Sequence, residues 1–219
     1  MTNPGHAPED LILRHATGAL DPAFSLLIET HLAMSSASRR LHAQFEALGG
    51  ALLEELAPAD VDPAAWNRTL RALDADGEPA VDRPKRKAAH PKLPEGFALP
   101  APLASVDIHH WRWIAPGVRS ASIALPEHGA SRAFLLEIAP GMTVPRHGHV
   151  GDEATCVLRG GFRDRDAHFG PGDVAQVDEE VEHDIVIDAG DPCLCLIAME
   201  GRTRPSSWFG RLYQKFRDI

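Results

Sequence analysis

Apolar residues in the first 80 positions recur every three or four residues, which is the interval of an amphipathic helix. The pattern predicts helices over residues 8–20, 21–34, 36–57 and 62–77. Gly49–Gly50 is expected to interrupt the third of them, and Ser35 or Ser36 to cap its start. Together these segments predict an N-terminal all-α helical bundle over residues 1–80.

From about residue 104 the spacing changes to short apolar runs separated by Gly, Pro and Asp. The runs predict strands over 105–114, 118–125, 131–139, 154–162, 173–177, 183–189 and 193–200. Many short strands at close spacing are typical of a β-sandwich or barrel. Four residues near the end return to helical spacing and predict a C-terminal helix against the sheet: Phe209, Leu212, Tyr213 and Phe216.

Between these halves the composition is that of a linker. Residues 79–102 contain six prolines, and residues 83–92 carry five Lys or Arg and no acid. The basic stretch is short and has no aromatic residue for base stacking, so a nucleic-acid site is not favoured. We therefore expect an α+β multidomain chain, with a helical domain at 1–80, a basic Pro-rich linker at 81–103 and a β-domain at 104–219.

The overall charge narrows the class of partner. The formal net charge is −9, which argues against direct nucleic-acid binding. Residues 1–82 hold 13 Asp or Glu against 5 Lys or Arg, so a basic protein partner fits the helical half. Because there is no long apolar run and no basic, apolar leader, no membrane association is expected and the predicted location is cytoplasmic.

One stretch of the β-half carries a metal-binding pattern. His147 and His149 are two residues apart, so on a strand both share one face, and Glu153 follows across a turn. His183, from a neighbouring strand, is the candidate third imidazole. Three imidazoles and a carboxylate suit a divalent first-row metal; Zn²⁺ is expected first, with Fe²⁺, Mn²⁺ and Ni²⁺ as alternatives.

The spacing G-x5-H-x-H-x3-E-x6-G, from Gly141 to Gly160, resembles the first motif of the cupin superfamily. That resemblance implies a jelly-roll barrel. The second motif is only partly kept, in Pro171-Gly172-Asp173 and the closing His183. A helical module before a cupin is similar, nearly end to end, to the ChrR family of zinc-containing anti-sigma factors.

This resemblance implies an anti-sigma factor that sequesters an extracytoplasmic-function (ECF) sigma factor through its helices. The cupin would sense singlet oxygen or related oxidative stress and cause release. The family's N-terminal zinc is held by a histidine and by H-x3-C-x2-C. In this chain His6 and His31 match the histidines, but Ser35 and Ser38 stand at both cysteine positions.

A serine hydroxyl is a poor zinc ligand, so the N-terminal zinc is expected to be absent or weak. Two explanations stay open: the serines were engineered, or the lineage lost the zinc and kept the helices by packing.

Three further alternatives stay open in the sequence. In the first alternative, the chain is a metal-dependent cupin enzyme such as a dioxygenase, although no catalytic residue stands out. A homodimer through the cupin is an alternative to a monomer bound to the sigma factor. The odd cysteines at 156, 193 and 195 predict core packing, with a redox role as the alternative, and Cys156 should point away from the metal.

Overall fold

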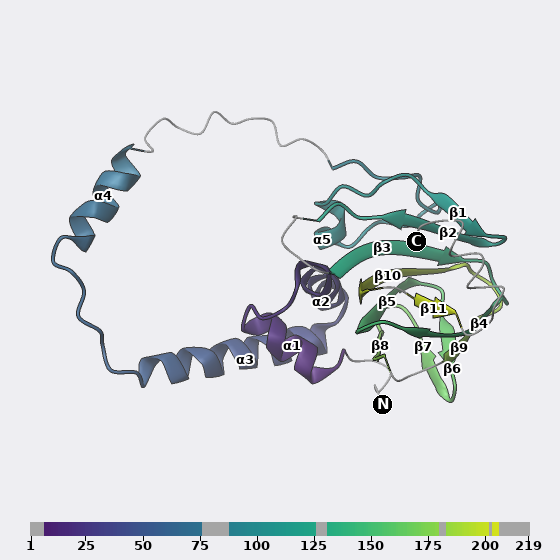
Figure 1. The fold of residues 1–219 in the computed structure, drawn as a ribbon, viewed down its shortest axis with the longest axis horizontal. Coiled ribbons are helices and arrows are strands. Elements are labelled where there is room, and N and C mark those ends of the chain that lie inside the picture. Colours follow the sequence, from purple (N-terminus) through teal and green to yellow (C-terminus); the bar gives the residue numbers. More distant parts are fainter. Residues whose placement is uncertain (1–6, 76–87, 126–130, 180–182, 202, 206–219) are drawn as a thin grey trace.

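The computed structural model describes residues 7–75, 88–125, 131–179, 183–201 and 203–205. Two facing β-sheets form a sandwich, and helices cover the outer face of one sheet (Figure 1). Its strands are β1 (Arg112–Ala115), β2 (Val118–Ser122), β3 (Ser131–Ile138), β4 (Thr143–His149), β5 (Glu153–Arg159), β6 (Phe162–Asp164), β7 (Ala167–Phe169), β8 (Val174–Val177), β9 (His183–Ile187), β10 (Cys193–Glu200) and β11 (Thr203–Pro205). The predicted C-terminal helix, with Phe209, Leu212, Tyr213 and Phe216, lies outside the described residues.

The two sheets have different strand orders. The larger sheet runs β1-β2-β3-β10-β5-β8 and the smaller one β11-β4-β9-β6-β7. All pairings between named strands are antiparallel, and the eight residues of β10 pair along the whole of β3. The predicted β-sandwich is confirmed. Pairing among the described strands does not join the sheets into a closed barrel.

Strand β10 shows why the molecule has two apolar layers. Its residues alternate between the inside of the sandwich and the helix side, and seven of the eight are buried. The interior core comprises Ile138, Val157, Phe162, Phe169, Ile187, Cys193, Cys195, Ile197 and Met199. The helix-side core contains Leu194, Leu196 and Ala198 of the same strand, together with side chains of the first two helices. A strand covered on both faces explains its unbroken apolar sequence.

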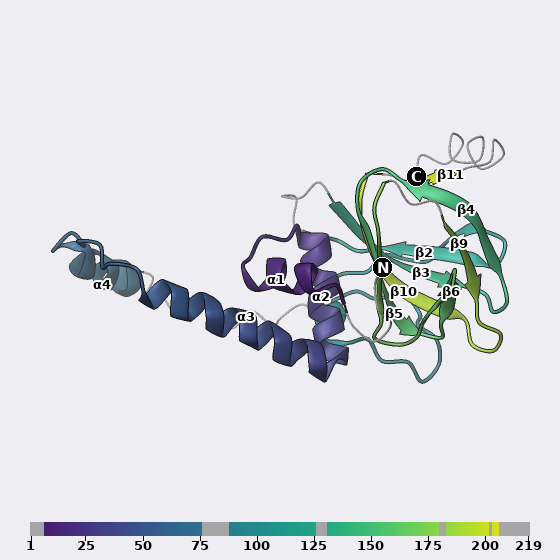
Figure 2. The same cartoon turned by 90° about the horizontal axis from the view of Figure 1, so that it is seen from below.

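The helices are α1 (Glu9–Ala16), α2 (Pro22–Met34), α3 (Ser36–Glu54), α4 (Ala65–Ala75) and α5 (Ala101–Ala104). Helix α2 lies on β3, β5 and β10 (Figure 2). Phe24, Leu27 and Ile28 are buried there. The Asp21 side chain accepts from the Ala23 N–H, which confirms the predicted cap. Within the described helices, none is long and apolar enough to cross a bilayer.

Helix α3 begins against α1 and α2 and then leaves the body of the molecule (Figure 2). Ser35 caps it by accepting from the Ser38 N–H. The predicted break at Gly49–Gly50 is wrong, because α3 continues through both glycines to Glu54. A glycine weakens a helix by about 1 kcal/mol without ending it, and an added Cβ would meet nothing within 4 Å at either position.

Helix α4 lies apart from the sandwich and from α1 and α2 (Figure 1). The described helices therefore form a cluster of α1, α2 and the start of α3 laid on a sheet, and the predicted bundle of all four is not formed. Part of the predicted linker is also packed: Leu103 of α5 is buried, and Trp111 Nε1 donates to the Lys92 carbonyl.

Candidate metal centres

The fold brings the predicted N-terminal half-site together. His31 sits near the end of α2, Ser35 is the cap between α2 and α3, and Ser38 lies in the first turn of α3. His31 Nε2 is 2.7 Å from Ser38 Oγ, and Ser35 Oγ donates to Ser38 Oγ at 3.2 Å. His31 and Ser38 are fully buried. The three positions therefore converge as metal ligands would. The fourth predicted ligand, His6, lies outside the described residues.

The chemistry of this half-site does not fit zinc. Two hydroxyl groups stand where thiolates would be, and a neutral hydroxyl binds zinc weakly. The nitrogen of His31 that faces the half-site, Nε2, already has Ser38 Oγ as its partner, while Nδ1 lies 2.7 Å from the carbonyl oxygen of Gly172. This tautomer donates from Nδ1 to Gly172 and accepts at Nε2 from Ser38. Hydrogen bonds thus satisfy the groups that the sequence predicted as metal ligands.

In the sandwich, the four predicted cupin ligands occupy one end of the fold. Residues 150–152 connect β4 to β5, so positions 149 and 153 are neighbours across the two sheets. Position 147 pairs with position 183 in the register of β4 and β9. Three of the positions belong to the smaller sheet and Glu153 begins β5 of the larger one.

A β-bulge sets the phase of β4 at this end. Val144 pairs with Ile185 and His147 with His183, so three residues on β4 match two on β9. One extra residue at Pro145–Arg146 returns position 147 to the face of Val144, whose side chain packs against the interior core. Proline in a strand is typical of such a bulge. The sequence analysis placed the histidines on one face but did not predict this bulge.

Glu153 shares the inner face of β5 with Val157, and the residue is only 7% exposed. A carboxylate buried to this degree is well placed to meet a cation, and the Thr155 hydroxyl also donates to it at 3.5 Å. His147 Nδ1 donates to the Pro145 carbonyl at 2.9 Å, which puts the ring lone pair on Nε2. Metal-binding histidines commonly make that backbone bond.

These observations fit a metal held by three imidazoles and a carboxylate. The side chains of His149 and His183 lie outside the described part of the structure. Among the side chains that are described, no group of three or more His, Cys, Asp or Glu could hold a metal ion. The backbone register therefore supports the predicted set of four, which remains a prediction.

The cysteines lie where their phase predicted. Cys156 packs in the helix-side core, on the opposite face of β5 from Glu153. Cys193 and Cys195 share the interior core, with their Sγ atoms 3.5 Å apart. Burial raises the pKa of the Cys156 thiol to about 12. The hydrogen bond with Cys193, and then burial, raises the pKa of Cys195 well above its ordinary value. Both thiols are therefore protonated at neutral pH, which favours a packing role.

Comparison with known proteins adds three findings. The profile of the ChrR Cupin-like domain family matches residues 102–200. The anti-sigma-E factor ChrR of Cereibacter sphaeroides is 36% identical over 217 residues, which cover 99% of each chain. The chain belongs to the ChrR family. A crystal structure of Rhodobacter sphaeroides SigE in complex with the anti-sigma ChrR matches with a TM-score of 0.67 and 34% identity, over 91% of this chain and 100% of that one.

Membership in the ChrR family confirms the resemblance and gives the chain a regulatory role instead of an enzymatic one. The match extends over nearly the whole chain, so it includes both the helices and the cupin-like sandwich. In this chain, Ser35 and Ser38 of the half-site act as hydrogen-bonding groups.

Proposed function

We propose that the chain sequesters an ECF sigma factor through an apolar surface on the outer part of α3 and on α4. This partner surface is defined by Leu48, Leu52, Leu53, Leu56, Val61, Trp66, Leu70 and Leu73, all of which are exposed. Its exposure is the observation that carries the proposal. A folded monomer rarely leaves so many large apolar side chains in water unless they meet a partner.

Helical spacing organises this surface into two stripes. Leu48 and Leu52 are four residues apart on α3, and Leu56 follows two residues after the helix ends at Glu54. Trp66, Leu70 and Leu73 form the corresponding stripe of α4. The exposed fractions reach 68% at Leu53 and 69% at Trp66, so the outer part of α3 and the stripe of α4 have no covering partner within the described chain. Such stripes are what a helix presents when it packs into an apolar groove of another protein.

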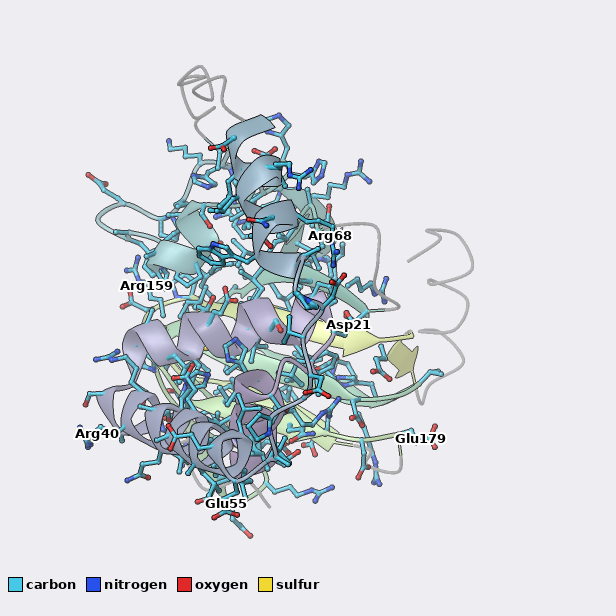
Figure 3. The ribbon with its side chains drawn as sticks, turned by 90° about the vertical axis from the view of Figure 1, so that its left-hand side faces the viewer. Asp21, Arg40, Glu55, Arg68, Arg159 and Glu179 are labelled. Atoms are coloured by element: carbon cyan, nitrogen blue, oxygen red, sulfur yellow. The ribbon has the colours of Figure 1, made fainter. Side chains whose placement is uncertain are left out.

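Three acidic side chains lie on the same helix as the apolar stripe of α3 or directly after it. Glu46, Glu54 and Glu55 are on α3 or at its end, and Figure 3 shows Glu55 pointing away from the helix into solvent. A sigma factor uses basic surfaces to bind promoter DNA. The negative side chains would therefore speed association with such surfaces and compete with DNA for them. Reversing the three charges should lower the association rate about tenfold at low salt and less at high salt.

The cupin end supplies the sensory part of the proposal. His147, His149, Glu153 and His183 would hold a divalent metal, with Zn²⁺ first among the candidates. Such an ion would act as a Lewis acid for a ligand or an oxidant. The signal class is an oxidant of the singlet-oxygen kind, as the family resemblance implies. Exposure of the complex to that oxidant should release the sigma factor, and release should fail after Glu153→Gln.

The experiment for the binding surface measures the affinity of the full-length chain for an ECF sigma factor from the same genome. Leu52→Ser with Leu56→Ser should weaken binding at least about 100-fold, because central apolar anchors dominate such interfaces. The thermal midpoint should stay unchanged, since both side chains are already in water. Val186→Ser, at a half-exposed apolar residue of β9, is the matched control and should bind normally. Unchanged affinity of the double variant would refute the proposed surface.

A further inference from the structure

We propose that His31 is the link through which the cupin end of the sandwich acts on the partner-binding helices. The half-site residues thus have a role that does not use a metal. This inference rests on the proposed function, because it assigns the regulation of the same partner surface.

His31 makes a buried polar connection at the end of α2, while Ser131 of β3 donates to Asp21 at the start of the same helix. His31 is fully buried near the end of α2, and it bonds to Gly172, which lies 141 residues later in the sequence. Its two ring nitrogens make one bond on each side, to Gly172 of the sandwich and to Ser38 of α3, each at 2.7 Å. A side chain held at both ends and shielded from water transmits displacement from one end to the other.

On the sandwich side, Gly172 is fastened to β5. The Gly172 N–H donates to the Val157 carbonyl at 2.8 Å, and the Val157 N–H donates to the Asp173 carbonyl at 3.0 Å. The Asp173 carboxylate accepts from the Gly170 N–H and so holds the turn closed. Gly172 has φ +92°, and a Cβ there would lie 3.7 Å from Met34 Cβ, so the turn packs directly against the end of α2.

The same strand carries Glu153. Val157 and Glu153 share the inner face of β5, four residues apart, and Glu153 lies at the predicted metal centre. A shift of β5 at that end therefore reaches Gly172 through two backbone hydrogen bonds. The path is contiguous from Glu153 through Val157 and Gly172 to His31.

On the helix side, His31 sets the start of α3. Ser38 Oγ is bonded to His31 and to Ser35, and Ser35 caps the helix. Arg39 adds a clamp, because its guanidinium donates to the carbonyls of Leu32 and Ala33 at the end of α2. A small rotation at this junction is amplified along α3, which carries the partner surface at its far end (Figure 2).

Hydrogen exchange of the full-length chain tests the link without any partner protein. The probe is Zn²⁺ alone, added to metal-free protein, with zinc uptake measured on the same sample. Amides of β4 and β5 should become slower to exchange. Amides of residues 31–41 should slow as well, by about fivefold to tenfold, the factor that one net hydrogen bond represents.

Two substitutions of His31 separate its bonds. The amide of His31→Asn reaches the position of Nδ1 and keeps the donor to Gly172 but loses the bond to Ser38, so its response should reach the end of α2 and not continue into residues 35–41. The amide of His31→Gln reaches toward Ser38 and loses the Gly172 bond, so its response should be confined to the sandwich. Glu153→Gln should show no response anywhere, which would exclude zinc bound at the half-site.

Each other outcome overturns a defined statement. Zinc uptake that slows β4 and β5 but leaves residues 31–41 unchanged in the wild-type chain would refute the link, whatever the variants do. An equal response in His31→Gln would also refute it. No zinc uptake by the wild-type chain would overturn the proposed cupin metal and the link with it. Unchanged sigma-factor affinity of the leucine variants would refute the partner surface, whereas the exchange response at residues 31–41 would still support the link between the sandwich and the helices.

Discussion

The two predicted metal centres differ in whether their residues have donor groups that bind a metal. At the cupin end, His147 and Glu153 retain the ligand chemistry, and the strand register puts their positions at one end of the sandwich. At the helix junction, His31, Ser35 and Ser38 retain the positions but not the sulfur. The described residues of the first site have donor groups that a divalent metal prefers, and its four-ligand set is a prediction; the second site lacks the sulfur that zinc prefers.

This difference shows that the backbone can bring the positions of a metal half-site together without a metal ion. The α2–α3 turn is fixed by the Ser35 cap and by apolar packing of α2, so positions 31, 35 and 38 converge without an ion. Oxygen at the two sulfur positions then makes the hydrogen bonds that buried groups require. The contrast gives four predictions, from the largest expected effect to the smallest.

Restoring sulfur at the junction should restore zinc. Ser35→Cys with Ser38→Cys is expected to add one tightly bound zinc per chain, with a gain on the order of 10 kcal/mol. A pocket of about 180 Å³ beside Ser38 leaves space for the larger sulfur atom. Zinc content by mass spectrometry of native protein provides the measurement. Ser36→Cys with Ser38→Cys is the control, because position 36 is exposed and does not converge with His31. Unchanged zinc content in the first variant would show that the positions do not form a ligand set.

The remaining sulfur should make the fold sensitive to alkali. The pKa of Cys156 rises from 9.0 to about 12 in the folded chain, so the folded state holds its proton more tightly than the unfolded state. This stabilisation is complete below pH 9 and is lost as the pH rises toward 12. The free energy of unfolding should fall by about 1.4 kcal/mol per pH unit for this group, about 4 kcal/mol in all.

Denaturant unfolding between pH 8 and pH 11 measures how the free energy of unfolding falls with pH. Cys156→Ala should reduce that dependence by the contribution of one titrating thiol. A slope that Cys156→Ala leaves unchanged would contradict the assignment.

Removing the cupin carboxylate should abolish metal binding there. Glu153→Gln keeps the shape of the side chain but removes its charge, and the affinity for Zn²⁺ is expected to fall more than about 100-fold. Competition with a fluorescent chelator gives the affinity. Glu95→Gln, on the exposed surface, is the control and should bind zinc like the wild-type chain. Equal affinities for the two variants would remove Glu153 from the site.

Breaking the junction should destabilise the fold moderately. Ser38→Ala leaves His31 Nε2 buried without its partner hydroxyl, and an unmade buried hydrogen bond costs about 1–3 kcal/mol. Ser36→Ala, at an exposed position two residues away, should change stability by less than about 0.5 kcal/mol. Equilibrium unfolding in urea compares the two. Equal effects would mean that the His31–Ser38 bond does not stabilise the junction.

The sequence allowed some of this structure to be predicted because local rules govern it. Apolar periodicity placed α2, α3 and most long strands, and a favourable cap residue located the start of α3. The β6–β7 hairpin was not predicted, because strands of three residues are too short to show alternation. The bulge at Pro145 was also missed, since a change of phase depends on the partner strand β9.

The His31–Gly172 bond could not be predicted for a different reason. It joins groups 141 residues apart, and nothing local to either residue specifies the partner. The same holds for the separation of α4, whose apolar stripe looked like the face of a bundle helix. Its exposure indicates a partner only when the packing of the whole chain is known.

The most direct test of the account is zinc content and sigma-factor affinity, measured together on full-length Glu153→Gln. This variant lacks the cupin carboxylate, so any tightly bound zinc would have to sit at the helix junction. The account predicts no bound zinc and an affinity for the ECF sigma factor within about tenfold of the wild-type chain, since one net hydrogen bond is the largest coupling expected. One zinc per chain, or binding that a strong chelator abolishes, would contradict a partner-binding domain organised without metal.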